Sequence, residues 1–413
     1  MAPSRLDLSS AASAAEPGAA SGLPEALRRQ LVRPTWVEVD LDAIEHNVRT
    51  VQRWLGAVKL IGVLKGDACG FGAAECGQAM EAAGIDMLAV GSGFEVRVLR
   101  DHGVRCPILL FASFAPDQAQ DIVALGAVPT IVDRASLAAL AQAARGRAQP
   151  LDVFVKIDTG LGRLGVPHAD APALVEAVAG TPRLRIAGLY SHMGGVAPER
   201  AVEQLRRMTQ ALAGIGALGI DPPFKVLAST PHLVQYPDMR LSAVDPGRLL
   251  FGIKPADVPC PDGKLEPALR ALRTRIVQVK AVTAGDPPDY GGAHSGRTYG
   301  VLPFGWTDVL LPEAYERSGA LVRGVRTAFL APLSAEHSVI DLTDVPDARA
   351  GDIVTVLGSD AGARIDVEHV AAAAGAEVSD LTRRLHRHLP FVYFRRGAPV
   401  RLKTPLGEFA APF

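Results

Sequence analysis

Cysteine is scarce in this sequence, and long apolar runs are missing. Four cysteines occur among 413 residues, at positions 69, 76, 106 and 260. None belongs to a Cys-X-X-Cys pair, so neither a zinc ribbon nor a redox dithiol is indicated. Few, unpatterned cysteines are typical of a protein kept in the reduced cytoplasm. No uninterrupted apolar stretch reaches the length of a membrane span, so we expect no membrane partner.

An excess of charge of one sign is also missing. Lys and Arg total 43, and Asp and Glu total 44. Because nucleic acids and membrane surfaces select a basic excess, this balance argues against both as partners. His386 and His388 are the one close pair of histidines, and in their basic C-terminal stretch we expect them to be solvated or packed rather than metal-bound. We therefore predict no metal site.

The chain changes in texture after its first 33 residues. Residues 1–33 are rich in Ala, Ser, Gly and Pro and lack the apolar core of a secretory signal. We expect most of this segment to be a disordered tail, with a short helix at 24–31.

The segment 34–264 alternates short apolar runs with helix-like stretches that carry charges at helical spacing. Strands that alternate with helices pair in parallel through crossovers. Eight such units have the size of a (β/α)8 TIM barrel. An open doubly wound sheet has the same periodicity and remains the alternative. The eight predicted strands are 58–65, 86–91, 107–112, 127–132, 151–157, 185–191, 224–229 and 248–253.

The segment 265–413 has fewer helix-like stretches. Helices are predicted at 366–376 and at 378–386, where Ser379 can cap the second. Strands separated by turn residues are predicted at 275–283, 297–304, 320–330, 337–342 and 352–357. The predicted fold is therefore of the α/β class, a TIM barrel followed by a smaller, mainly β C-terminal domain.

Lys65 ends the first predicted strand and precedes the glycine-rich segment GDACGFG. Active sites of such barrels lie at the C-terminal ends of the strands. Partial burial there lowers the pKa of a lysine, and a neutral amine is needed to form a Schiff base. Without further motifs, a lysine at a strand end is more often a solvated charge.

Three motifs in the same order resemble the alanine racemase family, which is of fold type III and carries pyridoxal phosphate on a barrel with a C-terminal β domain. The resemblance covers about residues 33–400 and implies pyridoxal 5′-phosphate as cofactor, Lys65 as its Schiff-base lysine and a small amino acid as substrate. The motifs are RPTWVEVDLDAIEHN (33–47), VLKGDACGFGA (63–73) and KIDTGLGRLG (156–165).

The resemblance also implies a second acid/base. Tyr290, in DYGGAHS, matches the tyrosine that acts on the face of the substrate opposite Lys65. Racemisation needs two such groups, because a proton leaves one face and arrives on the other. In the family this tyrosine comes from the partner subunit, which implies a homodimer with shared active sites. Read without the motifs, Tyr290 is an ordinary interface tyrosine.

Further residues match family positions at the site. Arg163 matches an arginine near the tyrosine and the substrate carboxylate, and Lys156 matches a lysine that is often carbamylated and steadies that arginine. His192, in YSHMGG, matches a histidine beside the cofactor ring, although a core histidine has the same pattern. The residues assigned to the phosphate end of the cofactor site are Ser229, Thr230 and Gly247.

The chain departs from the family at the pyridine nitrogen. The family places an arginine before Pro-Gly, whereas this chain has Asp245-Pro246-Gly247. A carboxylate keeps the ring nitrogen protonated and makes the cofactor a stronger electron sink. This favours reactions beyond racemisation, including retro-aldol cleavage, hydroxymethyl transfer and decarboxylation. The alternative is that Asp245 points elsewhere.

The phosphate and substrate ends also depart from the family. Cys69 and Arg387 align with two tyrosines, and Arg248 or Arg387 could pair with the phosphate instead. Trp306 replaces a tyrosine, and Ser334-Ala335 replaces a Met-Asp pair. Small residues there open room or remove a charge, which suggests a substrate other than alanine.

Three hypotheses follow from these residues. The leading one is an amino-acid racemase that uses Lys65 and Tyr290. The second is another reaction at the α-carbon of the substrate, of the aldolase, hydroxymethyl-transfer or decarboxylase type, enabled by Asp245. The third is a non-catalytic protein that binds pyridoxal phosphate, against which the presence of both acid/bases counts.

Overall fold

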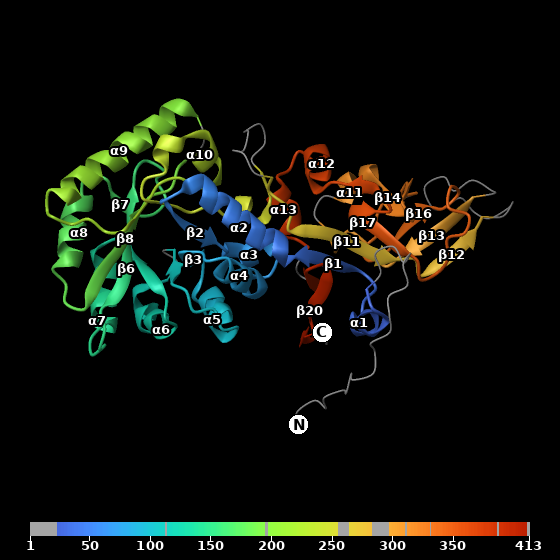
Figure 1. Ribbon diagram of the computed structural model, residues 1–413, viewed down its shortest axis with the longest axis horizontal. Helices are drawn as coiled ribbons and strands as arrows, with labels where there is room; N and C mark the ends of the chain where they lie inside the picture. Colours follow the sequence, from blue (N-terminus) through green and yellow to red (C-terminus); the bar gives the residue numbers. More distant parts are fainter. Residues whose placement is uncertain are drawn as a thin grey trace, which may run out of the picture. The chain divides into compact units, whose positions relative to one another are not determined.

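The computed structural model divides into two compact units (Figure 1). One is Ala43–Pro267, and the other joins Met1–Asp42 to Ala268–Phe413. The structure describes residues 23–111, 114–194, 197–254, 264–282, 297–309, 312–330, 332–385 and 388–410.

Eight parallel strands form a closed barrel in the first unit, and the pairs β2–β10 and β5–β6 complete the ring. The prediction of a (β/α)8 barrel is thus confirmed, and an open doubly wound sheet is excluded. The barrel strands are β2 (Lys59–Val63), β3 (Met87–Val90), β4 (Ile108–Leu110), β5 (Val128–Ile131), β6 (Leu151–Asp158), β8 (Leu184–Tyr190), β9 (Phe224–Val226) and β10 (Ala243–Val244). A short strand, β7 (Val166–Pro167), adds to the end of β6.

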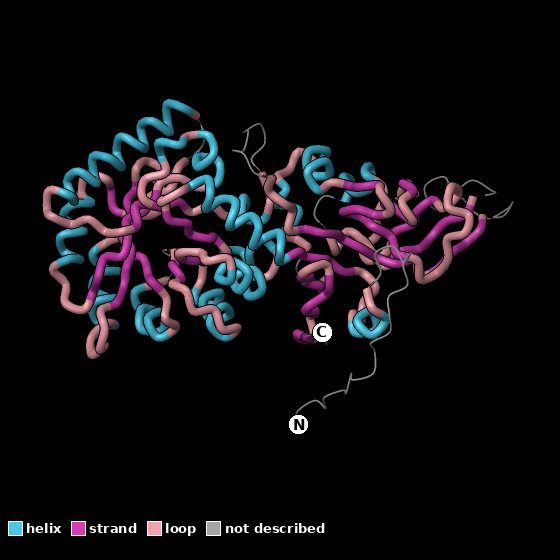
Figure 2. Tube along the Cα trace, viewed as in Figure 1, coloured by secondary structure: helices cyan, strands magenta, loops and turns pink. Residues whose placement is uncertain are grey.

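Helices lie outside the barrel strands (Figure 2). Two of them begin at full capping boxes, at Ser92 and Asp133, which satisfy the first free N–H groups. In the described ranges, no helix has the length and apolarity that crossing a membrane demands. The helices are α2 (Leu41–Leu55), α3 (Lys65–Gly70), α4 (Ala73–Ala82), α5 (Gly93–Asp101), η1 (Pro116–Gln118), α6 (Ala119–Ala124), α7 (Arg134–Ala143), α8 (Ala171–Ala179), α9 (Pro198–Gly216), α10 (Thr230–Gln235), η2 (Pro237–Met239) and η3 (Arg248–Phe251).

Inward-facing side chains fill the barrel. Phe154 and Tyr190 are buried there, and Phe111 and Phe224 pack against them. A filled interior leaves the rim as the place where a ligand can bind.

The prediction of an eighth barrel strand at residues 248–253 is wrong. Residues 248–251 form the 3-10 helix η3, and the strand that closes the barrel is Ala243–Val244. Two residues are too few to produce a period-two pattern. Pro246 follows at once, and a proline cannot donate to a strand ladder. The apolar run after Gly247 is therefore a helical turn packed in the core.

The second unit is mainly β, as predicted. A nine-stranded sheet and a three-stranded sheet make it up. Its strands are β1 (Trp36–Asp40), β11 (Leu269–Arg275), β12 (Gln278–Ala281), β13 (Thr298–Leu302), β14 (Ala320–Val322), β15 (Val325–Thr327), β16 (Ser338–Asp341), β17 (Ile353–Asp360), β18 (Ala363–Ile365), β19 (Phe391–Arg395), β20 (Ala398–Thr404) and β21 (Gly407–Ala410). Its helices are α1 (Glu25–Gln30), α11 (Pro312–Ser318), α12 (Val367–Ala373) and α13 (Val378–Thr382).

Two local expectations differ from the structure of this unit. Strand β1 pairs with β11 and β19, so residues 36–40 belong to this sheet and not to the barrel segment 34–264. The pairing joins residues more than two hundred positions apart, which no local pattern reveals. Helix α13 has Glu377 at its N-cap and Ser379 inside, so the predicted cap at Ser379 is wrong.

Part of the expected tail is packed. Helix α1 confirms the predicted short helix, and Leu23, Leu27 and Leu31 are buried against Trp36 and the β19–β20 hairpin. The sequence predicted the helix but not its packing, because the β19–β20 hairpin that its leucines contact lies far away in the chain. Residues 1–22 of the predicted tail lie outside the described residues.

Replacing Leu27, which is 6% exposed, by alanine tests whether α1 belongs to this core. We expect Leu27→Ala to lower the free energy of unfolding by about 2–4 kcal/mol, because the change leaves a cavity. Urea unfolding measures it. Leu406→Ala, at a position that is 75% exposed in the same unit, is the control. Equal stabilities of the two variants would contradict the packing of α1.

Candidate active site

Lys65 begins a strained turn just beyond β2. Residues Gly66, Asp67, Ala68 and Cys69 have φ values of 70°, 51°, 57° and 58°, so the segment labelled α3 is mostly a left-handed turn. Each non-glycine residue in that conformation costs about 1–2 kcal/mol. Such strain is typical of functional sites, where neighbouring contacts hold the backbone in place.

Hydrogen bonds hold this turn. Ala68 N donates to Leu64 O at 2.7 Å, and Asp67 N donates to Glu95 Oε1 at 3.1 Å. Asp67 Oδ1 accepts from Ala73 N at 2.6 Å, which ties the turn to the start of α4. The strained backbone is therefore anchored on both sides.

The side chain of Lys65 is exposed at the barrel rim, and its Nζ lies 5.6 Å from the ring centroid of Phe111. The expected partial burial is wrong, because β2 ends two residues earlier and the lysine projects past the strand. An exposed amine is available to a ligand that enters the rim.

Lys156, on β6, is buried instead, with 4% of its surface exposed. Its Nζ lies 4.0 Å from the ring centroid of Tyr190 and has no hydrogen-bond partner among the described residues. Burial lowers the pKa of Lys156 to about 8. The negative Asp245 opposes this shift, and the positive Arg163 adds to it. The Tyr190 hydroxyl contacts Thr130 Oγ1 at 3.2 Å, which fixes the ring beneath the amine.

Asp245 follows β10 and lies near the same rim. Its strand is the neighbour of β2, and Val63 N donates to Pro246 O at 3.2 Å. The carboxyl group is 6% exposed, and its Oδ1 lacks a partner in the described part of the chain. Burial raises the pKa of Asp245 to about 7, opposed by the charges of Lys156 and Lys65. A buried polar atom without a partner is costly and indicates a place for a ligand group.

His192 follows β8 and faces the same cluster of charges. Burial lowers the pKa of His192 to about 3, and the nearby positive Lys156, Lys65 and Arg163 act in the same direction. The imidazole is therefore neutral at neutral pH. A neutral ring can lie against a flat ligand without adding charge.

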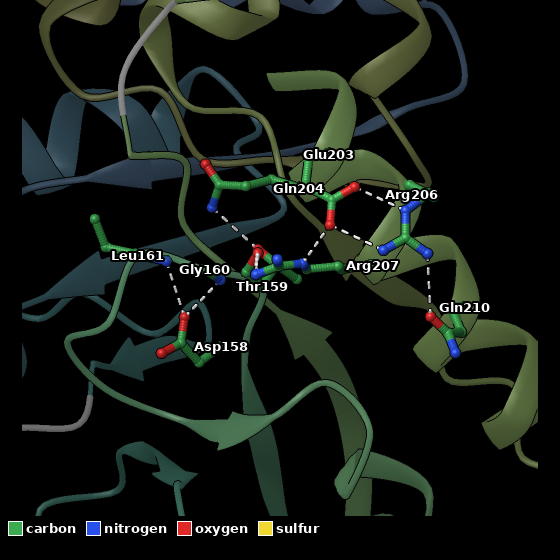
Figure 3. Close-up of polar contacts among 9 residues, drawn as sticks. All are labelled: Asp158, Thr159, Gly160, Leu161, Glu203, Gln204, Arg206, Arg207 and Gln210. Atoms are coloured by element: carbon green, nitrogen blue, oxygen red, sulfur yellow. Dashed lines mark hydrogen bonds and ion pairs between the residues drawn. The ribbon is translucent and has the colours of Figure 1, made fainter. Parts of the chain in front are cut away.

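The loop after β6 carries Arg163, whose side chain is exposed. Asp158 Oδ1 accepts from Gly160 N at 2.8 Å and from Leu161 N at 3.0 Å (Figure 3). Gly165 has a φ of 112°, and a Cβ there would lie 2.9 Å from Lys156 O. The glycines of the TGLGRLG motif thus let the loop pass close to Lys156.

The residues assigned to the phosphate end come together. Gly247 N donates to Thr230 Oγ1 at 3.2 Å, Ser229 is the N-cap of α10, and Arg248 begins η3. Two short helices therefore start side by side at this rim. The first N–H groups of helices have no partner within the helix and bind anions such as phosphate.

Trp306 and Ser334 meet in the second unit. Trp306 N donates to Ser334 O at 2.9 Å, and the Trp306 side chain is 52% exposed. Asp308 fixes the same loop, because it accepts from Gly305 N at 2.9 Å and pairs with Arg33 at 2.6 Å. Tyr290 and Arg387 lie outside the described residues.

Sequence reasoning missed three residues that support the site. Tyr190 lies under Lys156, Glu95 holds the turn after Lys65, and Gln204 joins two loops. Only Tyr190 had a usable signal, as the last inward-facing residue before the SHMGG segment. The other two contact partners that are distant in sequence.

The arrangement fits pyridoxal phosphate. Lys65 supplies an accessible amine, and the starts of α10 and η3 supply N–H groups for a phosphate. Asp245 supplies a buried carboxyl group whose Oδ1 has no hydrogen-bond partner where the structure describes the chain. Within the described ranges, no group of three His, Cys, Asp or Glu side chains could hold a metal ion.

The chain is similar to known proteins over most of its length. Residues 39–255 match "Alanine racemase, N-terminal domain", and residues 269–393 match "Alanine racemase, C-terminal domain". An "Alanine racemase" from Sorangium cellulosum is 32% identical over 382 residues, covering 88% of this chain and 99% of the relative. "Alanine racemase 1" from Caldanaerobacter subterraneus subsp. tengcongensis is 30% identical over 377 residues, covering 89% and 97%.

Solved structures share the fold. An alanine racemase from the D-cycloserine producer Streptomyces lavendulae matches with a TM-score of 0.78 and 27% identity, covering 88% of this chain and 97% of that one. One from Bacillus anthracis with bound L-Ala-P has a TM-score of 0.78 and 24% identity, covering 91% and 98%.

The raised pKa of Asp245 predicts how stability varies with pH. The folded cofactor-free protein binds this proton more tightly than the unfolded chain, since the pKa rises from 3.8 to about 7. The free energy of unfolding therefore falls as pH rises through this window. Asp245→Asn lacks that fall, so above neutral pH we expect it to be more stable than the original, by up to about 4 kcal/mol.

Urea unfolding of the cofactor-free proteins at pH values below and above this window measures the difference. Asp221→Asn is the control, because Asp221 has an 80% exposed side chain. If Asp245→Asn followed the same pH dependence as the original protein, the burial of an ionising carboxyl group would be contradicted.

Proposed function

This chain belongs to the alanine racemase family and is a pyridoxal-phosphate-dependent isomerase of the racemase type, and we propose that it racemises an amino acid with Lys65 and Tyr290 on opposite faces of the substrate. The observation that carries this proposal is the meeting, at one rim, of the exposed Lys65 amine and the buried Asp245 carboxyl group, whose Oδ1 has no hydrogen-bond partner among the described residues. They follow neighbouring parallel strands.

Each rim residue has a role in holding the cofactor. Lys65 would attach it covalently. Asp245 would hold a proton on its ring nitrogen. Ser229, Thr230 and Gly247 would bind its phosphate, and Arg248, next in the chain, would neutralise the phosphate charge.

The cofactor, when bound, withdraws electrons from the α-carbon of the amino acid and so acidifies the α-proton. Lys65 Nζ then takes or returns that proton on one face. The Tyr290 hydroxyl does so on the other face, which requires the partner subunit and hence a homodimer. His192, which is neutral at neutral pH, would lie beside the cofactor ring without adding a charge to it.

The substrate is a small amino acid whose carboxylate is drawn to the positive rim. Arg163 is exposed there, and both Arg163 and Lys156 lie close enough to His192 to lower its pKa. We infer a substrate other than alanine, because Trp306 and Ser334 stand at positions where the family has a tyrosine and a methionine. Cys69 and Cys76 are buried, and cysteines that are few and unpatterned support a reduced, cytoplasmic location.

A second function is favoured by Asp245. A carboxylate at the ring nitrogen would stabilise the carbanion at the α-carbon of the substrate for longer than racemisation requires. The same site could then cleave or transfer a carbon group, as an aldolase, a hydroxymethyltransferase or a decarboxylase does. A protein that only carries the cofactor is the third candidate, and it would need Lys65 but no second acid/base.

Proton NMR in heavy water tests the reaction. We expect the cofactor-loaded protein to exchange the α-proton of L- and D-amino acids and to form the opposite enantiomer. Exchange without inversion, or carbon–carbon cleavage, would favour the second function. If no amino acid reacted faster than alanine, the inference of a substrate other than alanine would be contradicted. Complete absence of exchange would contradict the racemase.

Tyr290→Phe tests the two-face assignment. We expect racemisation to fall by about 100- to 10,000-fold, the usual contribution of a general acid/base. Exchange of the α-proton should survive from one enantiomer, on which Lys65 acts alone. Tyr299→Phe, on β13 in the same unit, is the matched control. Equal loss of exchange from both enantiomers would contradict the assignment.

A further inference from the structure

One face of α9 contacts the two loops that carry Arg163 and His192. Arg200, Gln204 and Arg207 recur at spacings of four and three residues, so they share a helix face. Arg200 donates to Gly194 O at 2.8 Å, and Arg207 donates to Thr159 O at 3.4 Å. The helix therefore contacts the loop after β8 and the loop after β6 at once.

Gln204 is the centre of this face, and it is 2% exposed. Its Nε2 donates to Thr159 Oγ1 at 3.1 Å and to His192 O at 3.2 Å. Its Oε1 accepts from Gly194 N at 2.8 Å. One amide thus binds both loops, and Figure 3 shows it aimed at Thr159.

Two buried hydroxyl groups extend the connection. Thr159 Oγ1 and Ser191 Oγ lie 2.8 Å apart. Because Gln204 donates to Thr159 Oγ1, the Thr159 hydroxyl is free to donate to Ser191, which directly precedes His192. The loop after β8 is therefore joined to the loop after β6 at three points, the backbones of His192 and Gly194 and the side chain of Ser191.

The outer end of the helix face is held by charge. Glu203 accepts from both Arg206 and Arg207, each at 2.7 Å to Nε (Figure 3). A Cβ at Gly160 would lie 2.7 Å from the Arg207 guanidinium. These exposed pairs orient Arg207, whereas the buried amide of Gln204 makes the specific contacts to the loop that carries His192.

We propose that Gln204 is a positioning residue for the reaction, which sets His192 and the Arg163 loop at a fixed separation across the rim. This proposal rests on the roles proposed above for His192 and Arg163. The amide is required because it donates twice and accepts once. A carboxylate of the same shape accepts only, and a shorter amide cannot reach both loops.

The test compares Gln204→Glu and Gln204→Met with Gln210→Glu. The first keeps the shape, but its carboxylate only accepts, so the bond to His192 O is lost and the Thr159 hydroxyl has to donate. The second keeps the volume without any polar contact. Gln210 is exposed on the same helix and contacts Arg206 at 3.5 Å, so its variant is the matched control. Circular dichroism and thermal unfolding identify a variant that fails to fold.

Four readouts are expected to change. Hydrogen exchange of the Gly194 amide in the cofactor-free Gln204→Met protein should become faster, whereas a carboxylate at this position still accepts from Gly194 N. In both Gln204 variants, the affinity for pyridoxal phosphate and the visible circular dichroism of the bound cofactor should decrease. With the substrate that the original protein racemises fastest, kcat should fall by about 100-fold, the typical effect of a displacement near 1 Å.

The outcomes separate this proposal from the proposed function. If the original protein racemises nothing, the proposed function fails, while amide exchange and cofactor dichroism still test Gln204. A folded Gln204→Met protein with unchanged exchange, cofactor dichroism and affinity overturns the positioning role. A lower melting temperature with an unchanged cofactor spectrum overturns it too, because it would reveal support of the fold alone.

Discussion

The parallel pairing of β10 with β2 is the constraint on which the site depends, because it closes the barrel and brings both strand ends to one rim. All eight barrel strands point the same way, so residues that follow them gather there. Lys65 and Asp245 follow the two closing strands, and His192 follows β8. Aromatic side chains fill the interior below, which leaves the rim as the place for chemistry.

Charge at this rim is arranged for an anionic ligand. Lys65, Lys156 and Arg163 all act on the pKa of His192 from nearby, and Asp245 is the buried carboxyl group that opposes them. Burial leaves Lys156 Nζ and Asp245 Oδ1 without hydrogen bonds in the described part of the chain. Such groups cost stability, and a bound ring, phosphate and carboxylate would compensate for this cost. The site thus exchanges some stability for affinity.

Local patterns predicted what is local. Seven barrel strands, the turn after Lys65 and the glycines near Arg163 could be read from the sequence, because each depends on neighbours in the chain. The family motifs added Asp245, through the retained Pro-Gly. The two-residue strand β10, the pairing of β1 with β11 and the contacts of Gln204 could not be predicted, since they join residues far apart. The exposure of the Lys65 side chain was not predicted either, because the pattern does not reveal that β2 ends two residues before the lysine.

The covalent attachment of the cofactor is the central claim, and two lysines at the rim could serve. Lys156 is the nearest competitor, since burial lowers its pKa to about 8. Borohydride reduction of the cofactor-loaded protein, followed by peptide mass mapping, separates them. We expect a phosphopyridoxyl group on the peptide that carries Lys65 and none on Lys156. A label on Lys156, or on neither lysine, would contradict it.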